Sequence, residues 1–220
     1  MRRGGLNPRL LLSLLVLVVV AGGVALLTVG GSSGNKGKVT NASKTGRATA
    51  FDAEGELSPF KPAPPIVLHN YLGKPVDLAS YRGKAVLVTF LYTNCPDVCP
   101  LITSNLRVAQ NLMGPKVAAK AQIIAVSVDP KGDTPKAVAS FLARHEMTGR
   151  MQYLIGSAHE LAHVWEAWGV GSERDAQQPQ FINHTGAIFG ITASGKRETL
   201  YTASFKPADI AHDVPLLASR

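Results

Sequence analysis

The chain has 220 residues and a net charge of +8, but the basic excess is confined to its first quarter. Residues 1–50 hold seven of the 23 lysines and arginines and no acidic residue, whereas residues 51–220 hold sixteen basic against fifteen acidic residues. This near-neutral main part, without a basic cluster interleaved with aromatic residues, argues against nucleic-acid binding. Two cysteines in a chain of this length argue against a disulfide scaffold.

The N-terminal segment predicts a membrane anchor. Arg2, Arg3 and Arg9 precede an apolar run over residues 10–29, which is long enough to span a bilayer. Positive residues on its N-terminal side predict a cytoplasmic N-terminus, so the rest of the chain is expected on the extracytoplasmic side of the cell membrane. A cleaved signal sequence is the alternative.

A polar segment separates this anchor from the folded part of the chain. Residues 30–50 are mostly Gly, Ser, Thr, Asn and Lys, a composition typical of a flexible linker. We therefore expect three regions: an N-terminal transmembrane anchor or signal sequence (1–29), a linker (30–50) and one folded domain (51–220).

Within the folded domain, buried strands alternate with helices. The apolar and turn patterns predict strands at 66–68, 76–78, 85–92, 121–128, 152–155, 187–191 and 198–201, with a polar loop at 170–183. Helices are expected at 101–113, from about 134 to 145, at 158–168 after a capping box, and from 207 to about 217. This order predicts an α/β sheet with helices on both faces.

Both cysteines, Cys95 and Cys99, lie where the strand at 85–92 ends and a helix begins. Free backbone N–H groups and the positive end of the helix dipole favour a thiolate at such a junction. A thiolate binds soft metals or attacks disulfides. The alternative, two buried apolar cysteines, fits poorly with a CxxxC spacing flanked by prolines.

Three segments resemble the Sco/SenC family, membrane-tethered copper proteins of cytochrome c oxidase assembly. They are TxCPDxCP at 93–100, VSVDPKGDTP at 126–135, and the triplet Asn183-His184-Thr185. The order of strands and helices is likewise similar to a thioredoxin-like fold, a central mixed sheet with helices on both faces. The resemblance implies copper as the bound metal, and a cytochrome c oxidase copper-binding subunit or another copper protein as the partner.

The resemblance makes Cys95, Cys99 and His184 the copper ligands. Copper(I) is soft and prefers thiolates, and imidazole suits both copper oxidation states. Cysteines spaced i, i+4 at the start of a helix can point both sulfurs the same way. We also expect the two cysteines to interconvert between a dithiol and a disulfide, with copper bound only by the dithiol. In the fold that the resemblance implies, His184 begins a strand next to the cysteine-bearing strand. A hydrogen-bonded loop histidine is the alternative for His184.

Two functions fit these residues, and whether the protein is an enzyme is left open. The first is a copper chaperone that delivers copper to a cytochrome c oxidase copper centre. The second is a membrane-anchored thiol–disulfide oxidoreductase that reduces the cysteines of a copper acceptor. The CxxxC spacing, in place of the CxxC of thioredoxins, favours copper. A peroxiredoxin fits less well, because Tyr92 stands where a threonine is expected, three residues before the cysteine.

The roles of three acidic residues stay open. Asp97 has three alternative roles: it changes the basicity of the thiolates, it contacts a partner, or it is a solvated turn residue. Asp129 and Asp133 are either functional motif residues or parts of a loop and helix cap.

The segment HELAH at 159–163 matches the HExxH motif of zinc proteases. Helical periodicity places Leu161, Val164 and Trp168 on one apolar stripe, and His159 and His163 on the opposite, solvent side. No third ligand follows at a fixed short distance, which argues against a zinc protease. Metal binding by the histidine pair alone stays open.

Overall fold

The computed structural model describes residues 50–178 and 181–220. The expected anchor (1–29) and all but the last residue of the expected linker (30–50) lie outside these residues. Among the helices that the described residues form, none is long and apolar enough to cross a membrane.

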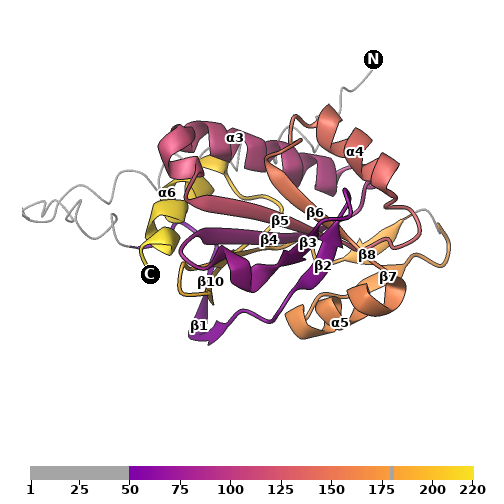
Figure 1. Ribbon diagram of the computed structural model, residues 1–220, viewed down its shortest axis with the longest axis horizontal. Helices are drawn as coiled ribbons and strands as arrows, with labels where there is room; N and C mark the ends of the chain where they lie inside the picture. The colour runs from indigo at the N-terminus through magenta and orange to yellow at the C-terminus, as the bar shows by residue number, and fades with distance from the viewer. Residues whose placement is uncertain (1–49, 179–180) are drawn as a thin grey trace, which may run out of the picture. The chain divides into compact units, whose positions relative to one another are not determined.

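A mixed eight-stranded sheet lies at the centre of the described domain (Figure 1). Its strand order is β1-β10-β9-β4-β5-β6-β2-β3. The neighbours β4, β5 and β6 run parallel, and the other pairs are antiparallel. The strands are β1 (Gly55–Pro62), β2 (Val67–Asn70), β3 (Pro75–Asp77), β4 (Ala85–Leu91), β5 (Ala121–Ser127), β6 (Met151–Ile155), β9 (Ile188–Ile191) and β10 (Lys196–Tyr201).

Strand β4 is buried along its whole length, because β5 and β9 flank it and helices cover the sheet. Its one polar side chain, Thr89, is satisfied by donating a hydrogen bond to the carbonyl of Ala187 at 3.1 Å. Complete burial explains why β4 reads as a continuous apolar run and not as an alternating pattern. The predicted strand at 85–92 is therefore confirmed to within one residue.

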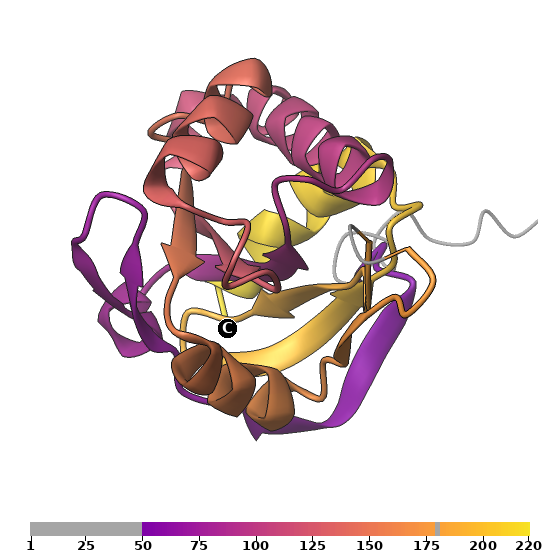
Figure 2. The ribbon, with the colours of Figure 1, turned by 90° about the vertical axis from the view of Figure 1, so that its right-hand side faces the viewer.

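Helices lie on both faces of the sheet, as expected. In Figures 1 and 2, α3, α4 and α6 lie on one face and α5 lies on the other. Their bounds are α3 (Val98–Ala118), α4 (Pro135–Arg144), α5 (Ala158–Trp168) and α6 (Pro207–Ala218), and a short 3₁₀ helix η1 (Leu78–Tyr81) follows β3.

Helix α3 is longer than the predicted 101–113 at both ends. It begins at Val98, so Cys99 lies in its first turn. Near its other end Gly114 adopts a positive φ of 67°, and Pro115 starts a second short helical piece. A glycine tolerates this backbone conformation and a proline suits the first position of a helix, so the chain bends there and continues.

The prediction of a polar loop at 170–183 was wrong in part. It contains β7 (Ser172–Arg174) and the start of β8 (Ile182–His184), which pair antiparallel as a separate two-stranded ribbon. His184 was expected to begin the strand beside the cysteine-bearing strand. Instead it ends β8, and the strand next to β4 is β9. Strand β1 was also not predicted.

Candidate metal centre

The segment before the first cysteine is held by a buried carboxylate. Asp133, only 4% exposed, accepts hydrogen bonds from the Thr93 N–H at 2.8 Å, the Ser127 hydroxyl at 2.6 Å and the Tyr153 hydroxyl at 2.9 Å. Burial raises the pKa of Asp133, although the hydrogen bonds act in the opposite direction. Asp133 thus connects the end of β4 to β5 and β6, and positions the loop that carries Cys95.

Replacing Asp133 with alanine is expected to destabilise the protein by about 3 kcal/mol or more, because three buried donors lose their acceptor. A thermal melt measures the effect. Glu173→Ala, which removes an exposed carboxylate from β7, is the matched control and should melt like the unaltered protein. An unchanged melting temperature for Asp133→Ala would contradict the positioning role.

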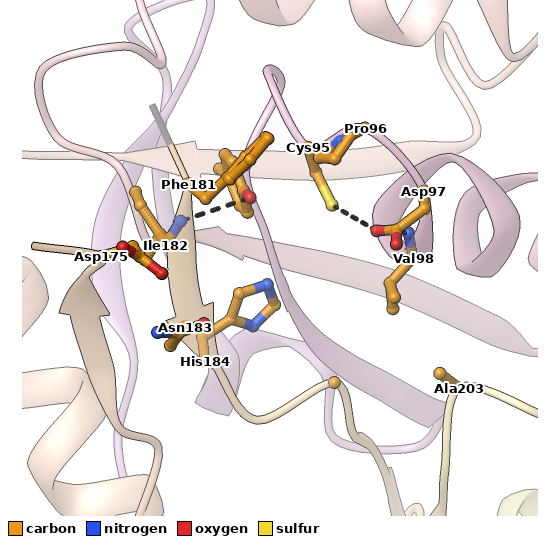
Figure 3. A pocket seen from close by; sticks show the side chains of 12 residues that line it. Cys95, Pro96, Asp97, Val98, Asp175, Phe181, Ile182, Asn183, His184 and Ala203 are labelled. Atoms are coloured by element: carbon orange, nitrogen blue, oxygen red, sulfur yellow. Dashed lines mark hydrogen bonds between the residues drawn. The ribbon is translucent and has the colours of Figure 1, made fainter. Parts of the chain in front are cut away.

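Asp97 caps the helix that carries the second cysteine. Its carboxylate accepts a hydrogen bond from the Val98 N–H at 2.6 Å. The Cys99 N–H in the first turn then donates to the Cys95 sulfur at 3.3 Å. When it is protonated, Cys95 can also donate to the Asp97 carboxylate, 3.8 Å away (Figure 3). The structure therefore gives Asp97 at least a capping role.

The two thiols differ strongly in acidity. A hydrogen bond from Cys99, then contributions from His184 and from the N–H groups of Cys99 and Asp97, lower the pKa of Cys95 to about 4 against the opposing effect of burial. The same hydrogen bond and burial raise the pKa of Cys99. Both cysteines are free, so the reduced pair holds a thiolate at Cys95 and a thiol at Cys99 near neutral pH.

Alkylation should therefore be selective. At pH 6, iodoacetamide is expected to modify Cys95, which is 8% exposed, and to spare the fully buried Cys99. Because Cys95 is ionised above a pKa of about 4, its rate should stay flat from pH 6 to 8 and fall as the pH drops towards 4. Peptide mass spectrometry measures both rates. A Cys95 rate that rises about tenfold per pH unit between 6 and 8, as for an ordinary thiol, would contradict this.

His184 presents one ring nitrogen to the second cysteine. Its Nε2 lies 3.7 Å from Cys99 Sγ, and its Nδ1 lies 3.3 Å from the Thr185 carbonyl. A carbonyl only accepts, so Nδ1 carries the proton of the neutral ring and Nε2 keeps its lone pair. This is the usual state of a metal-binding histidine.

The β7–β8 ribbon that carries His184 is fixed at two points. The Ile182 N–H donates to the Tyr92 hydroxyl at 3.4 Å, and an ion pair joins Arg174 to the buried Asp129 at 2.7 Å. Burial raises the pKa of Tyr92 to about 12, so its hydroxyl stays neutral. The Tyr92 ring also meets His184 edge-on, with 5.7 Å between centroids. Asp129 therefore helps to position the ribbon.

A cleft of about 670 Å³ opens between these elements. Cys95 and His184 line it, and Figure 3 shows the sulfur and the ring facing the same space. Cys99 does not line the cleft and lies fully buried behind it. The rest of the lining combines apolar side chains with two carboxylates, among them Val98, Phe181, Ile182, Asp97 and Asp175.

Comparison with known proteins gives a family. Residues 58–219 match the family model described as SCO1/SenC. The chain belongs to the SCO1/SenC family. The mitochondrial SCO2 homologue of Bos taurus is 27% identical over 214 residues, which is 96% of this chain and 75% of that protein. The mouse SCO2 homologue is 28% identical over 67% of this chain, which spans only 58% of the mouse protein.

A solved Sco structure shares the fold of this SCO1/SenC protein. The copper-bound ScoI of Bradyrhizobium japonicum is 28% identical with a TM-score of 0.62, over 71% of this chain and 99% of that one. The mixed sheet with helices on both faces is thus the thioredoxin-like fold of solved Sco proteins.

The candidate ligands in this Sco/SenC domain are neighbours, although they do not form a finished centre. Within residues 50–178 and 181–220, no three His, Cys, Asp or Glu side chains are already arranged to hold a metal ion. The 3.7 Å between Cys99 Sγ and His184 Nε2 nevertheless suits a shared ion. Metal–sulfur and metal–nitrogen bonds of about 2.3 and 2.0 Å at a trigonal angle separate the two ligand atoms by about 3.7 Å.

Proposed function

We propose that this protein is a copper metallochaperone, which binds copper(I) through Cys95, Cys99 and His184 and delivers it to a cytochrome c oxidase copper centre. The observation that carries the proposal is the position of His184 Nε2, 3.7 Å from Cys99 Sγ and in the same cleft as Cys95. The copper held by the ScoI structure of Bradyrhizobium japonicum supports the choice of metal.

The chemistry of the three side chains suits a soft metal that is held and then released. Two sulfurs and one imidazole are the ligands that copper(I) prefers. Cys95 is already a thiolate, whereas Cys99 must lose a proton as the metal binds, so binding releases protons. Of the three ligands, Cys95 and His184 line the cleft. Ligands of an acceptor that enters the cleft can therefore replace these two side chains one at a time.

The second candidate function is reduction of an acceptor disulfide. The lowered pKa of Cys95 and its place in the cleft favour it. The Cys95 thiolate would attack one sulfur of the partner and form a mixed disulfide. Cys99, after losing its proton, would then attack Cys95. The partner leaves as a dithiol, and the Cys95–Cys99 disulfide carries the two-electron oxidation.

One transfer experiment separates the two functions. Copper-loaded protein is mixed with the reduced copper-binding domain of a cytochrome c oxidase subunit, and the two are separated before metal analysis. A chaperone moves copper to this acceptor. In a second sample the acceptor is offered as a disulfide. If the donor keeps its copper in the first sample and reduces the acceptor in the second, the oxidoreductase is favoured.

We also propose that residues 1–29 anchor the protein in the cell membrane and that residues 30–50 connect the anchor to a domain of residues 51–220 outside the cytoplasm. Arg2, Arg3 and Arg9 before the apolar run support this orientation. Alkaline phosphatase fused after Arg220 is active only outside the cytoplasm, so the fusion should be active. A well-expressed but silent fusion would reverse the topology.

A further inference from the structure

The two histidines of the HELAH segment lie on the exposed side of α5 and share a hydrogen bond between their ring nitrogens. His159 and His163 are both exposed, whereas Leu161, Val164 and Trp168 on the opposite side of the helix are buried. The helix that carries the pair is fixed in place, because this apolar side packs into the core. The helix therefore holds the backbones of the two histidines about one turn apart.

Their ring nitrogens already lie at the separation of two ligands of one ion. His159 Nε2 and His163 Nε2 are 3.2 Å apart, and the rings meet at 89°. Metal–nitrogen bonds of about 2.0 to 2.1 Å place two ligand nitrogens about 3.3 Å apart at a tetrahedral angle and about 2.9 Å apart at a right angle. The observed distance falls between these values, so one ion can bind both rings without moving the helix.

The hydrogen bonds of Glu160 argue against the protease chemistry that the motif suggests. The Glu160 carboxylate accepts hydrogen bonds from the Ser157 N–H at 2.8 Å and the Ser157 hydroxyl at 2.7 Å. It therefore completes the capping box of α5 and does not face a water on a metal held by the two rings. Among the described residues no three-residue cluster forms around the pair.

We propose that His159 and His163 form a second metal site, which chelates one divalent, imidazole-preferring cation with water as the remaining ligands. Copper(II) is the preferred ion, and zinc(II) should bind more weakly, because affinity for nitrogen ligands falls from copper to zinc. The site offers no sulfur, unlike the pair at Cys95 and Cys99. The protein would then hold copper in two oxidation states at two separate places.

The test removes the first site and titrates the second. The full chain, free of any histidine tag and carrying Cys95→Ser, Cys99→Ser and His184→Ala, is titrated with copper(II) against a competing chelator. Electron paramagnetic resonance then counts the coordinated nitrogens. One copper(II) per chain with two imidazole nitrogens is expected. Adding His159→Gln or His163→Gln should weaken binding by about 100-fold, because losing either ring removes the chelate.

His69→Gln in the same background is the matched control, since it removes another exposed histidine, and it should leave the affinity unchanged. Circular dichroism checks that each variant is folded. The proposal is overturned if copper(II) does not bind stoichiometrically, if either pair variant keeps the parent affinity, or if His69→Gln weakens binding as much as the pair variants do.

Discussion

Replacing His184 with alanine is expected to weaken copper(I) binding by the reduced protein by about two to three orders of magnitude, because one of three ligands is lost. Reduction of a model disulfide should change far less. Exchange needs the Cys95 thiolate, and the hydrogen bond from Cys99 lowers its pKa more than His184 does. Copper competition against a chelator and disulfide reduction are measured side by side on one preparation.

Asn183→Ala is the matched control for this variant. Asn183 is exposed and lines the same cleft beside His184, so its loss should leave copper affinity near that of the unaltered protein. If copper retention survives in His184→Ala while disulfide reduction collapses, the histidine serves thiol chemistry. The oxidoreductase should then replace the chaperone as the proposed function.

In the variant His159→Gln/His163→Gln, which lacks the histidine pair on α5, oxidation is expected to abolish copper binding. Cys95 and Cys99 are free in the reduced protein, and their side chains are joined by a hydrogen bond, so a mild oxidant should link them. A disulfide offers no thiolate, which leaves His184 as a single weak ligand for copper(I). Copper content after oxidation, chelator washing and gel filtration measures the effect.

Two controls accompany the oxidation experiment. Reduction of the oxidised protein should restore copper binding, which excludes irreversible damage. The variant His145→Gln replaces a histidine that does not line the cleft. Made in the same background, it should lose copper on oxidation and regain it on reduction, as its parent does. Copper that stays bound with equal strength to fully oxidised protein would rule out the dithiol as the metal-binding form.

The central part of the fold was predictable because burial leaves a direct pattern in the sequence. Strands β4 and β5 are flanked by other strands and covered by helices, so each reads as a mainly apolar run and not as an alternating pattern. The capping box at Ser157 was found for a similar reason, since both partners lie within four residues of each other. Local rules reach such features because they depend on neighbours in the chain.

The β7–β8 ribbon could not be found in this way. Its strands are three residues each, too short for an alternating pattern to emerge. What holds the ribbon is contact over long sequence separation, such as Arg174 with Asp129 and Ile182 with Tyr92. Polar residues with distant partners look the same in the sequence as solvated loop residues.

The positioning role of Asp133 was hidden for the same reason. The motif at 126–135 indicated that the residue was special, but a helix cap explained it equally well. Thr134 is the residue that caps α4, and Asp133 instead bonds Thr93, forty residues earlier in the chain. The difference between capping and positioning appears only when β4, β5 and β6 are placed side by side.

X-ray absorption of copper-loaded, reduced protein tests the proposed ligand set most directly, because it identifies the atoms bound to the metal. The sample is the variant His159→Gln/His163→Gln, which keeps copper away from the histidine pair on α5. We predict one copper per chain with two sulfur ligands and one imidazole nitrogen. A first shell without sulfur, or one with two sulfurs that is unchanged by His184→Ala, would contradict it.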